Sequence, residues 1–324
     1  MITEKAPTRI DLAGGTLDIW PLSVMFAPSA SINVAIDLYA VVEARENAKL
    51  GAPVITTGDG KITIYSPNTA EKKKTLFHRA LDFIPVSGWE FSIKSSSPPG
   101  AGLGGSSSML IAFLRALNRI SGADFSIEEI MDAAKNMEAR HLGIPTGLQD
   151  YVAALNGGVN ALVNLKETRE CRPLGISAVD VEKRVVLAYS GESRNSGVPN
   201  WLMFKRAVER EKATVSAFEK IAKNSLDVLS AITEGRLGRV GGLIDKEEKQ
   251  RELLGRGVVT PAMRRVFAKV KKRGGHPKVC GAGGGGCFLV WCEPSRKDGI
   301  ISTLEESGMR RLDFRVAAEN PEKR

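Results

Sequence analysis

Residues 97–108 carry the sequence SPPGAGLGGSSS, a glycine-rich loop that leads into a predicted helix over residues 106–120. Glycines tolerate positive backbone φ angles and let the main chain approach an anion closely. The unpaired N–H groups at a helix N-terminus favour a phosphate group at the same place. Serine hydroxyls add hydrogen bonds and ligands for Mg²⁺. The stretch therefore predicts a phosphate-binding loop at the start of a helix.

Two well-known nucleotide-binding templates fit this loop poorly. Gly100, Gly102 and Gly105 match the dinucleotide pattern G-x-G-x-x-G, and Asp124 follows about 20 residues later. In that fold, however, the first glycine directly follows a strand, whereas two prolines precede Gly100 here. Asp124 also precedes a helix cap, where the template has the end of a second strand. A Walker A loop needs a lysine after its glycines, and none is present.

The composition is that of an ordinary globular protein. The chain has 324 residues, of which 43% are hydrophobic and 26% are charged. This length favours about two domains. No apolar run approaches the ~20 residues of a membrane-spanning helix, and no secretory signal or membrane partner is predicted. The four cysteines fit no zinc template and are expected to be reduced thiols, which favours a cytoplasmic location.

The net charge of +9 is compatible with small anionic substrates, anionic membranes or nucleic acid. Much of the excess lies in residues 72–74 and 264–278. Phe267 is the only Phe, Trp or Tyr in the second run, whereas surfaces that bind nucleic acid interleave such rings with cations. We therefore interpret the run as a solvated helix face, and a nucleic-acid partner is not favoured.

The order of the predicted elements favours an α+β fold, because strands and helices are mixed without regular βαβ alternation. A capping box at Ser126 and Glu129 begins a helix that extends to about Leu142. A long helical stretch is expected over residues 200–250, with breaks near Asn224 and at residues 235–242. A domain boundary is expected near residues 170–183. The remaining expected strands cover residues 9–12, 32–43, 62–65, 90–94, 157–165, 184–189, 287–291 and 310–316, and further helices cover 261–272 and 296–307.

The glycine-rich loop resembles the phosphate-binding motif of the GHMP kinases, which include galactokinase, homoserine kinase, mevalonate kinase and phosphomevalonate kinase. Residues 6–18 (APTRIDLAGGTLD) are similar to the family's first motif in its sugar-kinase form, and residues 279–288 (VCGAGGGGCF) are similar to its third. The resemblance implies two α+β domains with the active site between them. The first, over residues 1–175, would resemble domain 2 of ribosomal protein S5, and the second, over residues 176–324, would be ferredoxin-like. The implied cofactors are ATP and Mg²⁺, with the nucleotide held by Pro99, Gly100, Ala101, Gly102, Leu103, Gly104, Gly105, Ser106, Ser107 and Ser108.

The resemblance also implies the catalytic residues. Residues 147–158 (GLQDYVAALNGG) are similar to a segment of the sugar-kinase branch that includes heptose-phosphate and fucose kinases. In that branch the aspartate, here Asp150, is catalytic, and Arg9 would lie beside it. An arginine favours an ionised neighbouring carboxylate and stabilises charge on a transferring phosphoryl group. Glu138, twelve residues before Asp150, matches the family's Mg²⁺ ligand.

One serine of the loop is implied as a second Mg²⁺ ligand. Ser106 falls on the family serine that meets Mg²⁺ and phosphate. Gly105 stands where the family has the preceding serine. The choice between Ser106 and Ser107 for this role therefore stays open.

The substrate residues rest on shorter matches. Asp18 falls on the acid that holds sugar hydroxyls in several family members. Arg194 and Ser196 lie in residues 189–197 (YSGESRNSG), which resemble a segment of the heptose-phosphate and fucose kinase branch. Gly283 belongs to the glycine turn of the third motif, which supports the nucleotide and substrate loops in the family.

These observations predict an ATP- and Mg²⁺-dependent kinase that phosphorylates a hydroxyl of a sugar or sugar phosphate. A mevalonate-type isoprenoid kinase is the alternative within the same chemistry. A non-catalytic sensor of sugar and nucleotide is the alternative outside this chemistry. The sequence argues against it, because it retains the four expected site residues Arg9, Ser106, Glu138 and Asp150. A homodimer is compatible with the sequence.

Overall fold

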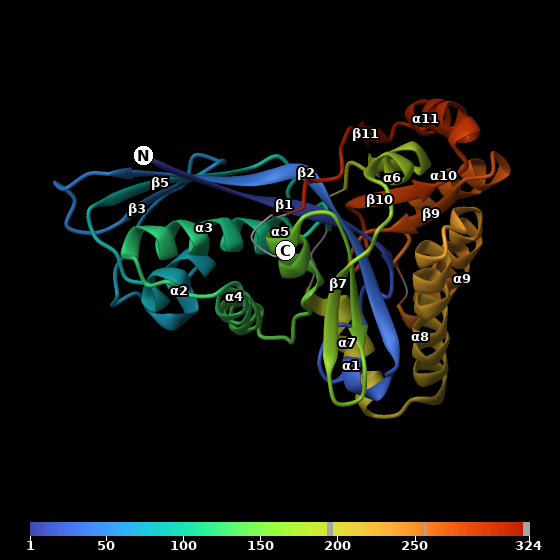
Figure 1. The fold of residues 1–324 in the computed structure, drawn as a ribbon, viewed down its shortest axis with the longest axis horizontal. Coiled ribbons are helices and arrows are strands. Elements are labelled where there is room, and N and C mark those ends of the chain that lie inside the picture. The colour runs from blue at the N-terminus through green and yellow to red at the C-terminus, as the bar shows by residue number, and fades with distance from the viewer. Residues whose placement is uncertain (193–196, 256, 320–324) are drawn as a thin grey trace.

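The computed structural model describes residues 1–192, 197–255 and 257–319, which form two β-sheets covered by helices (Figure 1). The first sheet has the strand order β4-β3-β5-β2-β6-β7, and β1 also pairs with β2. All its pairings are antiparallel except that of β3 with β5. Its strands are β1 (Ile2–Ala13), β2 (Ser29–Glu46), β3 (Val54–Thr57), β4 (Ile62–Ile64), β5 (Trp89–Ser95), β6 (Val159–Asn164) and β7 (Arg169–Pro173).

Helices α2 (Leu76–Phe83), α3 (Gly105–Ser121), α4 (Ile127–Leu142) and α5 (Gln149–Asn156) pack beneath this sheet. The Phe91 ring of β5 meets the Phe113 ring of α3 edge to face, with ring centroids 4.9 Å apart, a favourable arrangement of two aromatic rings. The expected capping box is present, because the Ser126 side chain accepts from the Glu129 N–H and the Glu129 side chain accepts from the Ser126 N–H. The cap fixes the start of α4, which carries Glu138.

The second sheet is antiparallel and has the order β11-β8-β10-β9. Alternate residues of β10 face opposite layers, as a strand requires. Phe288 packs in a core with α10 and α11, whereas Leu289 packs in a core with α8 and α9. The elements are β8 (Val185–Tyr189), β9 (His276–Val279), β10 (Cys287–Trp291), β11 (Arg310–Leu312), α6 (Ala178–Arg184), α8 (Lys212–Thr233), α9 (Val240–Leu254), α10 (Pro261–Lys272) and α11 (Lys297–Glu306).

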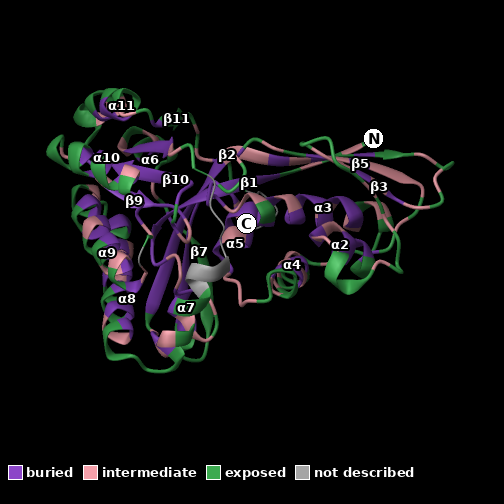
Figure 2. Ribbon diagram, turned by 180° about the vertical axis from the view of Figure 1, so that it is seen from behind, coloured by how far each residue is buried: buried purple, intermediate pink, exposed green. Residues whose placement is uncertain are grey.

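Two more helices and three 3-10 turns are found among the described residues. Helix α1 (Leu22–Met25) contacts α7 (Gly197–Val208). Three 3-10 turns lie at η1 (Glu71–Lys73), η2 (Leu237–Arg239) and η3 (Pro294–Arg296). Figure 2 shows that the exposed surface lies mainly on the outer faces of helices and on the connecting loops.

The two halves share one apolar core at their junction. Ile10 and Val34 of the first sheet pack in the same cluster as Leu187, Leu289 and Val228 of the second half. The last described residues also return to the first sheet, because the Ala317 N–H donates to the Ala35 carbonyl over 2.9 Å. The sheets divide between β7 and β8, and we propose residue 175 as the domain boundary.

The expected α+β fold is confirmed, and the break expected near Asn224 is wrong. Helix α8 runs through that position, where Asn224 is buried and its amide donates to the Leu243 carbonyl of α9 over 3.0 Å. Asparagine is a weak helix former, and this bond between two packed helices gives its buried amide nitrogen a partner within the continuous helix. The expected break near Gly235 is present, although α9 begins at Val240 and includes two further glycines.

Among the described residues, no helix has the length and apolar character needed to cross a membrane. Cys171 on β7 is exposed, whereas Cys280, Cys287 and Cys292 are buried.

Candidate active site

A cavity of about 990 Å³ opens between the glycine-rich loop, β1, α4, α5 and the glycine turn after β9. Its walls include the whole stretch 97–107, together with Arg9, Asp18, Glu138 and Asp150. The side chains predicted separately from three motifs therefore line one space. A volume of this size suits a nucleotide or another small molecule.

Gly104 shows why the loop needs glycine. It caps the start of α3 with a left-handed backbone, φ +74°, which is a conformation that glycine adopts without strain. A Cβ atom at Gly104 would stand 3.0 Å from Cγ of Asp150. The loop and the predicted catalytic carboxylate therefore lie in direct contact.

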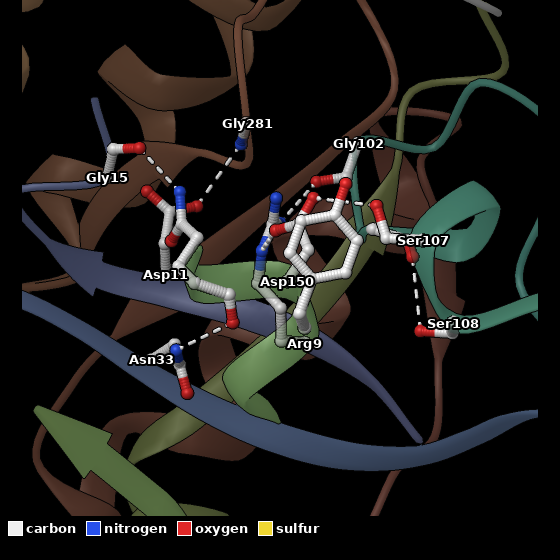
Figure 3. Close-up of polar contacts among 12 residues, drawn as sticks. Arg9, Asp11, Gly15, Asn33, Gly102, Ser107, Ser108, Asp150 and Gly281 are labelled. Carbon is white, nitrogen blue, oxygen red and sulfur yellow. Dashed lines mark hydrogen bonds and ion pairs between the residues drawn. The ribbon is translucent and has the colours of Figure 1, made fainter. Parts of the chain in front are cut away.

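Arg9 joins the loop to Asp150. Its Nε atom donates to Oδ1 of Asp150 over 2.6 Å, and its Nη1 atom donates to the Gly102 carbonyl over 2.6 Å. Figure 3 shows these three residues gathered together with Ser107. Burial alone would lower the pKa of Arg9, but the carboxylates of Asp150 and Asp11 raise it above the ordinary value. The guanidinium is therefore a fixed positive charge on the cavity wall.

The three serines at the start of α3 have different surroundings. Ser106 is exposed and lines the cavity. The buried Ser107 donates to Oε2 of Glu138 over 2.8 Å and lies 3.5 Å from Oδ2 of Asp150. Ser108 donates to the Pro7 carbonyl over 2.7 Å. Only the first two therefore have hydroxyls directed toward the carboxylates or the cavity.

Glu138 is buried on α4 and also accepts a hydrogen bond from the Tyr151 hydroxyl. Burial raises the pKa of Glu138, and the bonds from Tyr151, Ser107 and Ser106 oppose that rise. Burial and the neighbouring Glu138 raise the pKa of Tyr151, which stays a protonated donor. The sequence did not single out Tyr151, although its position next to Asp150 on α5 is the signal that it lies at the site.

The donor set fits Mg²⁺. Among the described residues, no group of three or more His, Cys, Asp or Glu side chains could hold a metal ion. Mg²⁺ commonly takes one or two protein oxygens and completes its shell with water and substrate phosphates. The Glu138 carboxylate and the Ser106 hydroxyl, both lining the cavity, offer such oxygens beside the glycine loop.

Asp18 is buried beside the N-terminus of α5. Its Oδ2 atom accepts from the backbone N–H groups of Leu148 and Gln149 over 2.6 and 2.9 Å. A Cβ atom at Gly147 would stand 2.0 Å from that oxygen, so only glycine fits there. The other oxygen, Oδ1, has no hydrogen-bond partner among the described residues. Burial raises the pKa of Asp18 to about 6 despite the bond from Gln149.

Of the other predicted substrate residues, Gly283 lies outside the cavity lining. Gly283 packs against Val258, where a Cβ atom would stand 2.5 Å from the Val258 carbonyl, and its neighbours Gly281 and Ala282 line the cavity instead. Arg194 and Ser196 lie outside the described residues.

Two family models match the chain. The model described as the GHMP kinases N terminal domain matches residues 68–158, and the model described as GHMP kinases C terminal matches residues 228–308. The matched stretches include the glycine loop, Glu138, Asp150 and the glycine turn.

Similar proteins cover nearly the whole chain. A D-glycero-alpha-D-manno-heptose 7-phosphate kinase of Campylobacter jejuni is 25% identical over 98% of this chain and 97% of its own. A mevalonate kinase of Pyrococcus furiosus is 26% identical over 95% and 93% of the two chains. Among solved structures, a D-glycero-D-manno-heptose 1-phosphate kinase of Bacteroides thetaiotaomicron has a TM-score of 0.75 at 23% identity, covering 99% of this chain and 97% of its own. The Methanococcus jannaschii mevalonate kinase has a TM-score of 0.76 at 18% identity, covering 97% and 98%.

Proposed function

The chain belongs to the GHMP kinases, and from this premise we propose that it transfers a phosphoryl group from ATP to a hydroxyl of a sugar or sugar phosphate. The single observation that carries the proposal is the contact of Arg9 with both Asp150 and the carbonyl of Gly102. This contact puts a carboxylate and a fixed cation beside a phosphate-binding loop. A non-catalytic sensor would not need both groups at that place.

In the proposed reaction Asp150 holds the acceptor hydroxyl and takes its proton, or orients it for attack. Arg9 stabilises the charge that develops on the transferring phosphoryl group. The glycine loop and the N-terminus of α3 hold the phosphates through main-chain N–H groups. Bound Mg²⁺ would neutralise phosphate charge, with Glu138 and Ser106 as its protein ligands. Ser107 orients Glu138 through the bond between their side chains.

Asp18 supports a polyhydroxylated acceptor. Its Oδ1 atom is buried, has no partner among the described residues and belongs to a side chain that lines the cavity. A carboxylate oxygen accepts hydrogen bonds from hydroxyl groups. The similarity to a heptose 7-phosphate kinase along the whole chain supports the same substrate class. Arg194 remains our candidate partner for a phosphate already on the substrate, with Ser196 beside it in sequence.

A mevalonate-type substrate is the second candidate, because several mevalonate kinases align with more than nine-tenths of the chain. Mevalonate carries its own carboxylate, and two carboxylates within about 4–6 Å of one another disfavour their joint ionisation. Asp18 therefore favours a neutral hydroxyl-rich group. We also propose a cytoplasmic location, and a homodimer stays a prediction.

The experiment is an ADP-release screen over free sugars, sugar phosphates, mevalonate and homoserine. We expect the highest kcat/KM with a sugar or sugar phosphate. If mevalonate is turned over faster than every sugar tested, the acceptor assignment is wrong and the kinase assignment stands. Absence of acceptor-dependent ADP release across an extended panel would favour the sensor.

The role of Asp150 is tested by Asp150→Asn. We expect kcat to fall by roughly 10²–10⁴, the usual worth of a positioned acid–base group. ATP affinity, measured by calorimetry, should stay within a few fold because the glycine loop is intact. Wild-type kcat in this variant would remove Asp150 from the catalytic role.

A further inference from the structure

Behind the glycine turn lies a cluster of buried charges that the proposed chemistry does not use. Lys278 on β9 has no exposed surface and contacts Asp11 of β1, which lies 267 positions earlier in the sequence. Its Nζ atom also lies 3.5 Å from Oε1 of Glu247 on α9. Glu248 and Arg251, on the same helix, are buried as well and lie 3.1 Å apart. We call Asp11, Glu247, Glu248, Arg251 and Lys278 the buried cluster.

Side chains of the buried cluster form hydrogen bonds with the main chain of residues 279–281. Asp11 Oδ1 accepts from the Gly281 N–H over 3.1 Å (Figure 3). Arg251 donates to the carbonyls of Val279, over 2.6 Å, and Gly281. Glu248 accepts from the Val279 N–H over 3.2 Å. The start of the glycine turn is therefore held by charged side chains from both β1 and α9.

The other end of the turn holds the phosphate-binding loop. The Cys287 N–H donates to the Ala101 carbonyl over 2.7 Å. A Cβ atom at Gly286 would stand 2.6 Å from that same carbonyl oxygen, so the two backbones touch. On its far side the loop is held by β1, because the Arg9 N–H donates to the Leu103 carbonyl over 2.9 Å.

The contacts close a ring from β1 to the glycine turn, from the turn to the phosphate-binding loop, and from the loop back to β1. Asp11 and Arg9 both belong to β1, two residues apart. We infer that Asp11 is a positioning residue for phosphoryl transfer: paired with Lys278, it holds Gly281 so that the phosphate-binding loop and Arg9 keep the spacing that ATP needs. The inference rests on the proposed function.

The lowered pKa of Asp11 supports its pairing with Lys278. Burial alone would raise the pKa of Asp11, but the nearby Lys278, Arg251 and Arg9 lower it to about 2. A buried ion pair often contributes little to stability compared with apolar residues of the same size. Stability therefore does not explain the pair by itself. The hydrogen bond from the Gly281 N–H to Oδ1 of Asp11 indicates that the pair positions the glycine turn.

Two double variants separate positioning from stability. Asp11→Asn with Lys278→Met removes both charges and keeps a side-chain oxygen for the Gly281 N–H. Asp11→Leu with Lys278→Met removes both charges and that acceptor. We expect the Asn pair to keep at least tenfold higher kcat, and to bind ATP at least tenfold more tightly, than the Leu pair. Misplacing a catalytic group by about 1 Å costs on the order of 10²-fold in rate. Arg184→Met, which breaks the surface pair with Glu293 at 2.7 Å, is the control and should leave both quantities unchanged.

Equal kcat and equal ATP affinity in the two double variants, with only their melting temperatures differing, would overturn the inference. ATP affinity is measured by calorimetry without an acceptor, so this result is independent of whether the sugar assignment is correct. If the Leu pair does not fold, hydrogen exchange of the Gly281 amide decides. We expect slow exchange in the wild-type protein and in the Asn pair, whereas exchange as fast as that of an exposed loop in the wild-type protein would overturn the inference.

Discussion

Asp18 gives the site a pH dependence at the scale of one residue. Its pKa of about 6 means that the carboxylate loses its charge, and one acceptor oxygen, as the pH falls through that value. We expect kcat/KM for the acceptor to fall below about pH 6, while ATP affinity changes little. The measurement is a pH profile of kcat/KM from pH 5 to 8. Asp18→Asn should have a lower value and a flat profile in this range.

The same titration affects stability with a definite sign. The ordinary pKa of 3.8 is raised to about 6 by burial, so the folded state holds this proton more tightly than the unfolded state. The contribution of Asp18 is therefore fully present below pH 3.8 and is lost as the pH rises to about 6. A pKa shift of two units corresponds to about 3 kcal/mol of unfolding free energy.

The kcat/KM prediction has its own control. An Asp18→Asn variant that keeps the acidic fall in kcat/KM would contradict the assignment of that fall to Asp18.

At the scale of one element, the three neighbouring serines in the first turn of α3 have different contacts, and we expect a different effect from replacing each one. We expect Ser106→Ala to raise the Mg²⁺ concentration needed for half-maximal rate, because Ser106 faces the cavity beside Glu138. Ser107→Ala should lower kcat, because it releases the 2.8 Å bond that orients Glu138. Ser108→Ala is the matched control and should lower only the melting temperature, because its hydroxyl bonds to Pro7. An unchanged Mg²⁺ requirement in Ser106→Ala would move the metal contact to Ser107.

At the scale of the whole molecule, the last described residues tie the two halves together. The Asp37 N–H donates to the Arg315 carbonyl and the Gly158 N–H donates to the Ala317 carbonyl, over 3.0 and 2.9 Å. A chain ending at Asp313 should therefore lose about 2–4 kcal/mol of unfolding free energy, from several main-chain bonds at about 0.5–1.5 kcal/mol each. Urea unfolding measures the change, and a chain ending at Glu319 keeps these bonds as the control. Identical midpoints would show that the returning segment does not stabilise the fold.

Motifs made of neighbouring residues predicted the loops, caps and helix starts that those same residues form. The glycine loop, the start of α3 and the cap at Ser126 each follow from neighbouring residues, and so does the placement of Asp150 near the start of α5. The strand β9 was missed because it has only four residues, one of them proline. The low helix propensity of Asn224 predicted a helix break. The prediction was wrong because the bond from Asn224 to α9 joins residues of two different helices, and no local pattern shows it. The Asp11–Lys278 pair could not be predicted because no local pattern links positions so far apart.

The distribution of the cysteines has a practical consequence. Cys171 is exposed on β7, whereas the three other thiols are buried in the second half of the chain. A maleimide dye added to the native protein therefore attaches at Cys171 without any substitution. The thiol lies 3.5 Å from the amide of Asn156 at the end of α5, and the opposite end of that helix carries Asp150. A fluorophore at Cys171 thus reports on the helix of the active site from outside the cavity.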